Sequence, residues 1–497
     1  MTISGIGTSI SPVIQAAVDM RQQLDDLQRQ LGTGQKADTF AGLGPQGGLA
    51  TGLSAQLAAI SSFNDTLTIV GTRIGIAQTV LTQISDVGGQ VKSATLLPNF
   101  AIDGTGQTGT QETARNHLDQ ILGLLNTQVG DRFLFSGTAV TQPAVDTTDH
   151  ILNGNGAQAG LKQIISERNQ ADLGATGLGR LVIPPAAGTT VSVSEDVAGS
   201  PFGFKLAGVS STLTGAAVAG PSGSPATITV NLGANPNNGE NLTFTFDLPD
   251  GSTENLTLQA TTSTPPGPNQ FTIGATPAAT GANLQAALTA SVDTLAHTAL
   301  SAASAVAAAN DFFASNPPQR VAGPPFDTAT ALVAGTPANT VSWYIGENGA
   351  NPPRSTATAH IDPSITVSYG TRANEEGIRW IVQQVATLAA TSYLPTDPNA
   401  AASYAALNQR LNTSLAVPAG VQKVDDIAAS LASAQTAMAA AKDRHQQTQK
   451  TLADMLQSIE GISPEQVGAE ILTLQTSLQA SLQTTALLAR TSLVNFI

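Results

Sequence analysis

Apolar residues near the start of the chain recur at alternating steps of four and three positions. The first such run consists of Val13, Ala17, Met20, Leu24, Leu27 and Leu31. Residues with this spacing share one stripe of an α-helix, and a stripe that keeps the period is a heptad seam, which favours packing against other long helices. After a glycine-rich break at residues 42–48, the pattern resumes from Leu53 to Leu81, which predicts a helix over residues 50–94.

The C-terminal part of the chain repeats the same spacing. One seam runs from Ile427 to Ile459 and includes His445, just as the N-terminal seam includes Asn64. A polar residue at such a position can set the register of paired helices. After a helix-start signal at residues 463–465, a last seam and its extension contain Val467, Ile471, Leu474, Leu478, Leu482 and Leu493. Helices of this length need long partners, so we expect the two ends of the chain to pair.

The middle of the chain has a different pattern. From about residue 140 to 370 the heptads stop, and Gly, Pro, Ser and Thr become frequent. Alternating apolar positions predict strands within residues 226–274, with Asp250-Gly251 as a hairpin turn, and an Ala-rich helix over residues 280–313. The expected fold is therefore mainly α: a long antiparallel helical rod built from the N- and C-terminal heptad segments, with an inserted α+β outer region.

These changes of pattern predict three parts. A shorter seam over residues 114–125 predicts a further helix, and an amphipathic helix over residues 375–390 marks the return to the rod. The predicted parts are an inner terminal-helix domain (1–45 and 462–497), a helical rod domain (46–140 and 371–461) and the inserted region (141–370).

Composition and charge exclude several classes of function. The chain has 21 basic and 35 acidic residues and a net charge of −14, so binding to the phosphate backbone of nucleic acid is not expected. The absence of cysteine excludes disulfides, thiolate zinc sites and cysteine nucleophiles. The N-terminus lacks the basic and continuous apolar segments of a cleaved signal peptide, and no run is apolar and long enough to predict membrane insertion.

Candidate chemistry is sparse. Gly104, Gly106 and Gly109 satisfy G-x-G-x-x-G, but a helix rather than a strand is expected before them, so we interpret the segment as a connector. The histidines lack the spacing of a zinc protease, and neither a nucleophile elbow nor a P-loop is present. The sequence thus predicts a protein that is not an enzyme and that uses no cofactor or metal.

The terminal seams have two interpretations. They can form an intramolecular bundle, or they can hold surplus apolar surface for other subunits, and we expect both to apply because two narrow helices cannot bury all their apolar residues against each other. The residues expected at a subunit interface are Val13, Ala17, Met20, Leu24, Leu27, Leu31, Val467, Ile471, Leu474, Leu478, Leu482 and Leu493.

Both ends of the chain resemble bacterial flagellins and their hook-associated relatives. Residues 31–36, LGTGQK, are similar to the L-S-T-G-K-[KR] element of that superfamily, with Leu31, Thr33 and Gly34 at the matching positions. Residues 481–497 resemble its extreme C-terminus. One departure is the segment ADTFAGLG at residues 37–44, where most relatives continue with an acidic, Ala-rich stretch.

A second resemblance is to the hook-filament junction proteins of that superfamily, also called hook-associated protein three. Residues 130–138, GDRFLFSGT, are similar to their G-x-[RK]-[YF]-x-F-[SA]-G segment, which filament flagellins usually lack. The matching residues include Arg132, Phe135, Ser136 and Gly137. Residues 369–376, YGTRANEE, also resemble the junction-type sequence that re-enters the rod.

The resemblance implies a structural subunit of the bacterial flagellum at the hook-filament junction, supporting swimming motility. It implies coiled terminal helices in the inner layers of a helical assembly, with the same protein, other hook-associated proteins and flagellin as partners. It further implies an extracellular protein that leaves through the flagellar export apparatus, with an export chaperone and without a cleaved signal peptide. Two alternatives stay open: a filament-forming flagellin, and a secreted adhesin or glycan-binding protein that uses residues 210–313.

Overall fold

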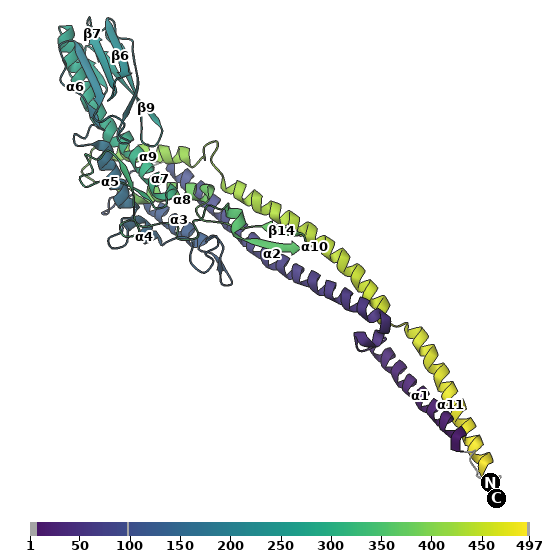
Figure 1. Ribbon diagram of the computed structural model, residues 1–497. Coiled ribbons are helices and arrows are strands. Elements are labelled where there is room, and N and C mark those ends of the chain that lie inside the picture. Colours follow the sequence, from purple (N-terminus) through teal and green to yellow (C-terminus); the bar gives the residue numbers. More distant parts are fainter. Residues whose placement is uncertain (1–6, 97–98, 495–497) are drawn as a thin grey trace. The chain divides into compact units, whose positions relative to one another are not determined.

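A computed structural model describes residues 7–96 and 99–494; side chains at 7–11, 13 and 488–494 are not described (Figure 1). Helices hold about half of the residues, and a β-containing region separates the long helices of the two ends. The contacts divide the chain into two compact units. The first comprises Met1–Gly71, Ala359–Val367 and Gln435–Ile497, and the second comprises Thr72–Thr358 and Ser368–Ala434.

The long helices follow the predicted seams. They are α1 (Gly7–Thr33), α2 (Gly47–Thr95), α10 (Val424–Glu460) and α11 (Pro464–Val494), with a 3-10 helix at Phe40–Gln46 in the break between α1 and α2. In the first unit α1 packs along α11, and the first half of α2 packs on the second half of α10 (Figure 1). The core between α2 and α10 consists of Ala50, Leu53, Leu57, Ile60, Leu452, Leu456 and Ile459, together with Leu43.

Besides parts of α2 and α10, the second unit contains several shorter helices. They are α3 (Gly109–Leu125), α4 (Thr148–Asn153), α5 (Leu161–Leu173), α7 (Ser301–Ala314), α8 (Glu376–Ala390) and α9 (Ala400–Ser414). The start of α3 is fixed by a capping box, in which the Thr108 hydroxyl accepts from the Gln111 amide and the Gln111 side chain accepts from the Thr108 amide. Helix α3 packs on α8, and α7 contacts α5, α8 and α9.

Two four-stranded sheets and one helix share the core of the inserted region. One sheet has the order β3 (Leu181–Val182), β4 (Thr190–Glu195), β7 (Thr227–Leu232), β6 (Ala216–Ser222). The other has the order β10 (Gln270–Thr272), β9 (Thr253–Thr261), β8 (Asn241–Asp247), β5 (Lys205–Ser211). Helix α6 (Pro277–Leu295) contributes Leu284, Leu288 and Val292 to the core that both sheets supply.

The predicted hairpin is present: β8 and β9 pair antiparallel around the Asp250-Gly251 turn, from Asn241↔Gln259 to Asp247↔Thr253. The Ala-rich helix is α6, joined to α7 by a π-helical turn at Ala296–Leu300. The sheets also contain β3, β4, β5 and β6, which precede the predicted range of 226–274. The remaining elements are small: β1 (Gln128–Val129) with β2 (Arg132–Phe133), β11 (Gln319–Val321) with β12 (Leu332–Ala334), β13 (Thr358–Asp362) with β14 (Ile365–Ser368), and a 3-10 turn at Pro353–Thr356.

The predicted three-part division of the chain remains a prediction. The compact units separate at Gly71 and Gln435, within the segments assigned to the rod. The first unit therefore contains the terminal helices, part of α2 and α10, and residues 359–367 of the β13–β14 hairpin. The second unit contains the rest of those two helices and the rest of the inserted region.

Candidate assembly interface

The terminal helices α1 and α11 run antiparallel within the first unit, and they contact each other along their length (Figure 1). Of the residues predicted at a subunit interface, Val467 and Ile471 are buried at 6% and 9% exposure. Six others are half-buried: Ala17, Met20, Leu24, Leu27, Leu474 and Leu478. Leu31 and Leu482 are exposed, at 45% and 54%. The side chains of Val13 and Leu493 lie outside the described residues. The pairing of α1 with α11 thus covers only part of the predicted seams.

Apolar side chains outside the predicted seams are also exposed. They are Ile14, Val18, Leu472 and Leu487, each 45–67% exposed. Ile14 and Val18 follow the seam residues by one position and are four residues apart, so they form a second row beside the first seam. This row was not predicted from the sequence, because a single heptad seam includes only one residue of each adjacent pair. An apolar face wider than one partner helix can cover indicates surface for further helices.

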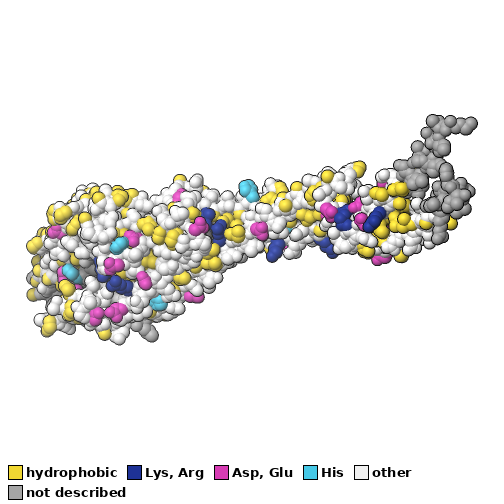
Figure 2. All heavy atoms as spheres, turned by 90° about the horizontal axis from the view of Figure 1, so that it is seen from below, with side chains coloured by type: hydrophobic (Ala, Val, Ile, Leu, Met, Phe, Trp, Pro, Cys, Tyr) yellow, Lys and Arg dark blue, Asp and Glu magenta, His cyan; other side chains and the backbone are white. Residues whose placement is uncertain are grey.

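Charged side chains are few on the face of the molecule drawn in Figure 2, as expected of a chain with 11% charged residues. Hydrophobic side chains lie among backbone and uncharged polar side chains over most of this face. Contacts to a surface of this kind depend on shape and apolar burial more than on ion pairs.

The connector LGTGQK, at the end of α1, contacts the segment that follows α10. The backbone of Gln35, just after α1, pairs with Gly461, just after α10, and the Lys36 amide donates to the Glu460 carbonyl at 2.7 Å. Gly34 adopts φ +72°, a left-handed conformation that ends α1. The Lys36 ammonium donates to the Ile459 carbonyl at 3.0 Å, so a positive charge lies at the C-terminus of α10, where the helix dipole favours it.

Other residues of this connector are open to solvent. The Thr33 hydroxyl donates to the Arg29 carbonyl at 2.9 Å and accepts from the Gln35 amide at 3.3 Å, while Leu31 and Gly34 are exposed. The connector therefore fixes the place where α1 and α11 leave α2 and α10, and it leaves an apolar side chain at its edge.

The two segments that resemble junction proteins lie against each other in the second unit. Ser136 bridges Arg372 in an antiparallel arrangement, and the Ala373 amide donates to the Phe135 carbonyl at 2.9 Å. Phe135 and Ser136 are fully buried, and the Ser136 hydroxyl donates to the Gln142 carbonyl at 2.8 Å. Residues 130–138 and 369–376 thus form one local structure.

Buried ion pairs surround this structure. Arg372 pairs with Glu347, and Arg354 pairs with Glu375. Burial raises the pKa of Glu375, and the charge of Arg354 opposes that rise. Gly137 has φ +66°, and a Cβ there would lie 2.8 Å from Glu347 Oε2, so only glycine fits without a shift. Arg132 is half-buried and lines a small cleft with Arg73 and Tyr369.

The described residues offer little else for catalysis or metal binding. No group of three or more His, Cys, Asp or Glu side chains among them is placed to hold a metal ion. In the G-x-G-x-x-G segment, the Asp103 carboxylate accepts from the Thr105 hydroxyl and from the amides of Thr105 and Gln107. These contacts lower the pKa of Asp103. The carboxylate thereby occupies backbone amides that a phosphate would need. No helix in the described parts of the chain has the length and apolar character to span a bilayer.

A comparison with protein families matches residues 14–140 to the bacterial flagellin N-terminal helical region. A comparison with curated proteins finds no match. The matched range contains α2, α3, the LGTGQK connector, residues 130–138 and most of α1. Flagellins are structural, non-enzymatic proteins that assemble into axial structures outside the cell. The N-terminal quarter of this chain is therefore similar to the flagellin N-terminal helical region, which supports a flagellar structural subunit of the flagellin superfamily.

Proposed function

We propose that this protein is a structural subunit of the bacterial flagellum that assembles at the junction between hook and filament and supports swimming motility. The observation that carries the proposal is the exposed apolar face of α1 and α11 in a chain whose residues 14–140 match a flagellin region. The partners are further copies of this chain, other hook-associated proteins and flagellin. The protein reaches the outside of the cell through the flagellar export apparatus, with an export chaperone and without a cleaved signal peptide.

Apolar burial would drive assembly through the terminal helices. Each exposed leucine on α1 and α11 would contribute roughly 1.5–3 kcal/mol when a neighbouring subunit covers it completely. Several such residues suffice for a stable contact, and the spacing along the helices gives that contact a defined register. Buried helical seams would transmit torque from hook to filament, since sliding one helix past another exposes the whole apolar row.

The paired segments 130–138 and 369–376 support a junction role over a filament role. Both resemble junction-type sequences, and backbone contacts join them through Phe135, Ser136, Arg372 and Ala373. They lie in the second unit, away from the residues of α1 and α11 in the sequence, so they can distinguish a junction subunit without altering the shared assembly helices.

Gene deletion followed by electron microscopy tests the proposal. Cells that retain hooks, lack filaments and shed the major flagellin into the medium would support a junction role. Normal flagella would contradict both flagellar roles. Complementation with the intact gene is the control for effects on neighbouring genes.

A filament-forming flagellin is the second candidate, because the matched family model describes the flagellin N-terminal region. Stoichiometry separates the two roles. In purified flagella a junction subunit is a minor component, whereas a filament flagellin is the major one. Quantitative mass spectrometry of flagella from intact cells makes this measurement, and deletion of a filament gene would remove the major band itself.

A further inference from the structure

Four asparagines of the chain are each followed by a glycine: Asn153, Asn155, Asn238 and Asn348. In such an Asn-Gly pair the backbone nitrogen of the glycine can attack the side-chain carbonyl carbon of the asparagine, because the new bond closes a five-membered ring and glycine has no Cβ to obstruct the approach. The attack needs a glycine nitrogen that is free of hydrogen bonds and a side-chain amide that water can reach. The fold therefore decides which of the four pairs can react.

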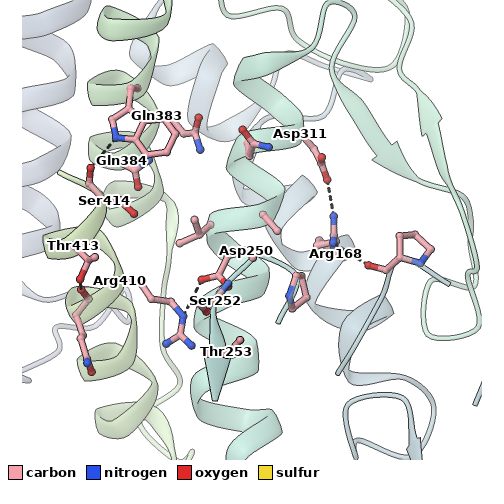
Figure 3. A pocket seen from close by; sticks show the side chains of 18 of the residues that line it. Arg168, Asp250, Ser252, Thr253, Asp311, Gln383, Gln384, Arg410, Thr413 and Ser414 are labelled. Atoms are coloured by element: carbon pink, nitrogen blue, oxygen red, sulfur yellow. Dashed lines mark hydrogen bonds and ion pairs between the residues drawn. The ribbon is translucent and has the colours of Figure 1, made fainter. Parts of the chain in front are cut away.

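Burial protects other side-chain amides of the second unit. Gln383 and Gln384 on α8, drawn in Figure 3, are only 3% and 1% exposed, and Asn408 on α9 is 0% exposed. None of these three residues precedes a glycine. The asparagines of the four Asn-Gly pairs are all exposed, so burial does not distinguish one pair from another.

Hydrogen bonds hold three of the four pairs. Their glycine nitrogens all donate: Gly154 to the His150 carbonyl at 2.9 Å, Gly239 to the Ala260 carbonyl at 2.8 Å, and Gly349 to Glu347 Oε1 at 2.8 Å. Their asparagine side chains are also engaged: Asn153 donates to Asp149 at 2.6 Å, Asn238 accepts from the Thr262 amide at 3.0 Å, and Asn348 accepts from Asn374 at 3.2 Å. Each of these pairs must break at least one hydrogen bond before the glycine nitrogen can attack.

The pair of Asn155 and Gly156 is free of such bonds. Within the described residues the Gly156 nitrogen donates to no acceptor, and the Asn155 side chain makes no hydrogen bond. Both residues are exposed, and a Cβ on Gly156 would meet no atom within 4 Å. The attacking nitrogen and the side-chain amide are therefore both available, in a place that water and hydroxide can reach.

The geometry of the turn accounts for this freedom. The Asn155 amide donates to the Gln158 carbonyl and the Gln158 amide donates to the Asn155 carbonyl, each at 3.0 Å. These two bonds close a two-residue hairpin loop, in which Gly156, at φ +60°, occupies the first central position. The closing bonds use only the backbone groups of residues 155 and 158, so the N–H of Gly156 is left without an acceptor.

We propose that the fold selects Asn155 as a site of spontaneous deamidation. Base in the solvent removes the amide proton of Gly156, and the Gly156 nitrogen forms a bond to Cγ of Asn155. The bond between Cγ and the side-chain nitrogen breaks, ammonia leaves, and a cyclic imide remains. Water then adds to one of the two imide carbonyls and opens the ring to aspartate or isoaspartate, so one water is consumed for each ammonia released. This inference is independent of the flagellar role.

Isoaspartate would loosen a contact within the second unit. In isoaspartate the main chain runs through Cγ, so the carbonyl that accepts from the Gln158 amide is no longer part of the turn. Gln158 Nε2 donates to the Pro337 carbonyl at 2.6 Å, and the Ala159 amide donates to the Asn339 carbonyl at 2.9 Å. A distorted turn should therefore weaken the attachment of residues 157–160 to residues 337–341.

Peptide mapping by mass spectrometry, after incubation of the full-length protein at pH 8, tests the proposal. Deamidation raises the mass of a peptide because oxygen replaces NH, and fragment ions separate Asn153 from Asn155. Asn155 should deamidate at least about threefold faster than each of the other three asparagines, since those must first lose a hydrogen bond. A rate at Asn155 no higher than at the others would overturn the proposal.

The same incubation in guanidinium chloride is the control for effects of sequence alone. In the unfolded chain all four glycine nitrogens are free, so the four rates should become similar and the lead of Asn155 should disappear. A lead of the same size in the unfolded chain would show that the hydrogen bonds of the fold do not select this site, and it would overturn the proposal.

Asn155→Gln is the matched variant, because it keeps the amide and lengthens the side chain, so that attack would have to close a larger ring. It should remove the modification at this position and leave the other three rates unchanged. After incubation, hydrogen exchange should be faster over residues 157–160 and 337–341 in the parent than in Asn155→Gln. Equal exchange in an incubated parent that contains isoaspartate at position 155 would contradict the loosening of this contact.

Discussion

The imidazole of His445 on α10 faces the side-chain amide of Asn64 on α2, with 3.1 Å between Nδ1 and Oδ1. Both are seam positions in the sequence, and His445 is only 5% exposed. On its other side, Nε2 lies 3.5 Å from the carboxylate of Asp362 in the β13–β14 hairpin. Two polar side chains that pair only in one alignment fix the register of two helices whose facing seams are otherwise mostly apolar.

Removing one member of this pair should cost more than removing both. Asn64→Leu leaves His445 buried without its amide partner, at a cost of about 1–3 kcal/mol in the free energy of unfolding. Asn64→Leu combined with His445→Leu should recover most of this loss, because the seam becomes apolar and Asp362 keeps its contact with Arg444 at 3.5 Å. Urea unfolding of Asn64→Leu, His445→Leu and the double variant measures the coupling, and simple addition of the two single effects would contradict it.

Sustained periodicity is what made the long helices predictable. The range of 50–94 expected from the seam agrees with α2 at Gly47–Thr95, and the seam from Ile427 to Ile459 lies within α10. Strand β6 was not predictable in the same way. Its sequence, AAVAGPS, has little β propensity, and it is a strand because β7 pairs with it.

Contacts between residues far apart in the sequence account for the parts of the fold that could not be predicted. The bridge between Gln35 and Gly461 and the bridge between Ser136 and Arg372 join segments that lie far apart in the sequence. No local pattern reports such pairs, although resemblance to known motifs singled out three of the four segments.

Two glycines that are two positions apart should respond oppositely to the same substitution. Gly32 lies within α1 and Gly34 has φ +72°, and a Cβ at either position meets no atom within 4 Å. Gly32→Ala should stabilise α1 by roughly 0.5–1 kcal/mol through lower chain entropy in the unfolded state. Gly34→Ala should destabilise it by roughly 1–2 kcal/mol through left-handed strain. Thermal unfolding followed by circular dichroism measures both, and equal shifts would contradict the assignment.

Acid should weaken the contact between two loops of the inserted region, one at Thr214 and the other at residues 237–240. The Glu240 carboxylate accepts from the Thr214 hydroxyl at 2.6 Å, from the Thr214 amide at 2.7 Å and from Asn237. These hydrogen bonds lower the pKa of Glu240 from 4.5 to about 2. A lowered folded-state pKa stabilises the fold above pH 4.5, and this contribution is lost as the pH falls from 4.5 to about 2.

Glu240→Gln is the matched variant, because it removes the charge and keeps the shape. The parent should melt above the variant at pH 6, and the difference should shrink steadily between pH 4.5 and pH 2. Thermal unfolding at a series of pH values measures this difference. A gap that stays constant over this range would contradict the role given to the carboxylate.

A charge at Leu482 should block assembly without harming the subunit. Leu482 on α11 is 54% exposed, so Leu482→Asp should change the free energy of unfolding by less than about 0.5 kcal/mol. In the proposed assembly the same position is covered, and an unpartnered carboxylate there costs several kcal/mol. Gln483→Asp places the same charge one residue away, at an exposed polar position, and serves as the control. In the deletion strain, immunoblots of the medium should detect both variants as exported, whereas electron microscopy should find filaments only with Gln483→Asp. Normal filaments with Leu482→Asp would show that this apolar position is not part of a subunit contact.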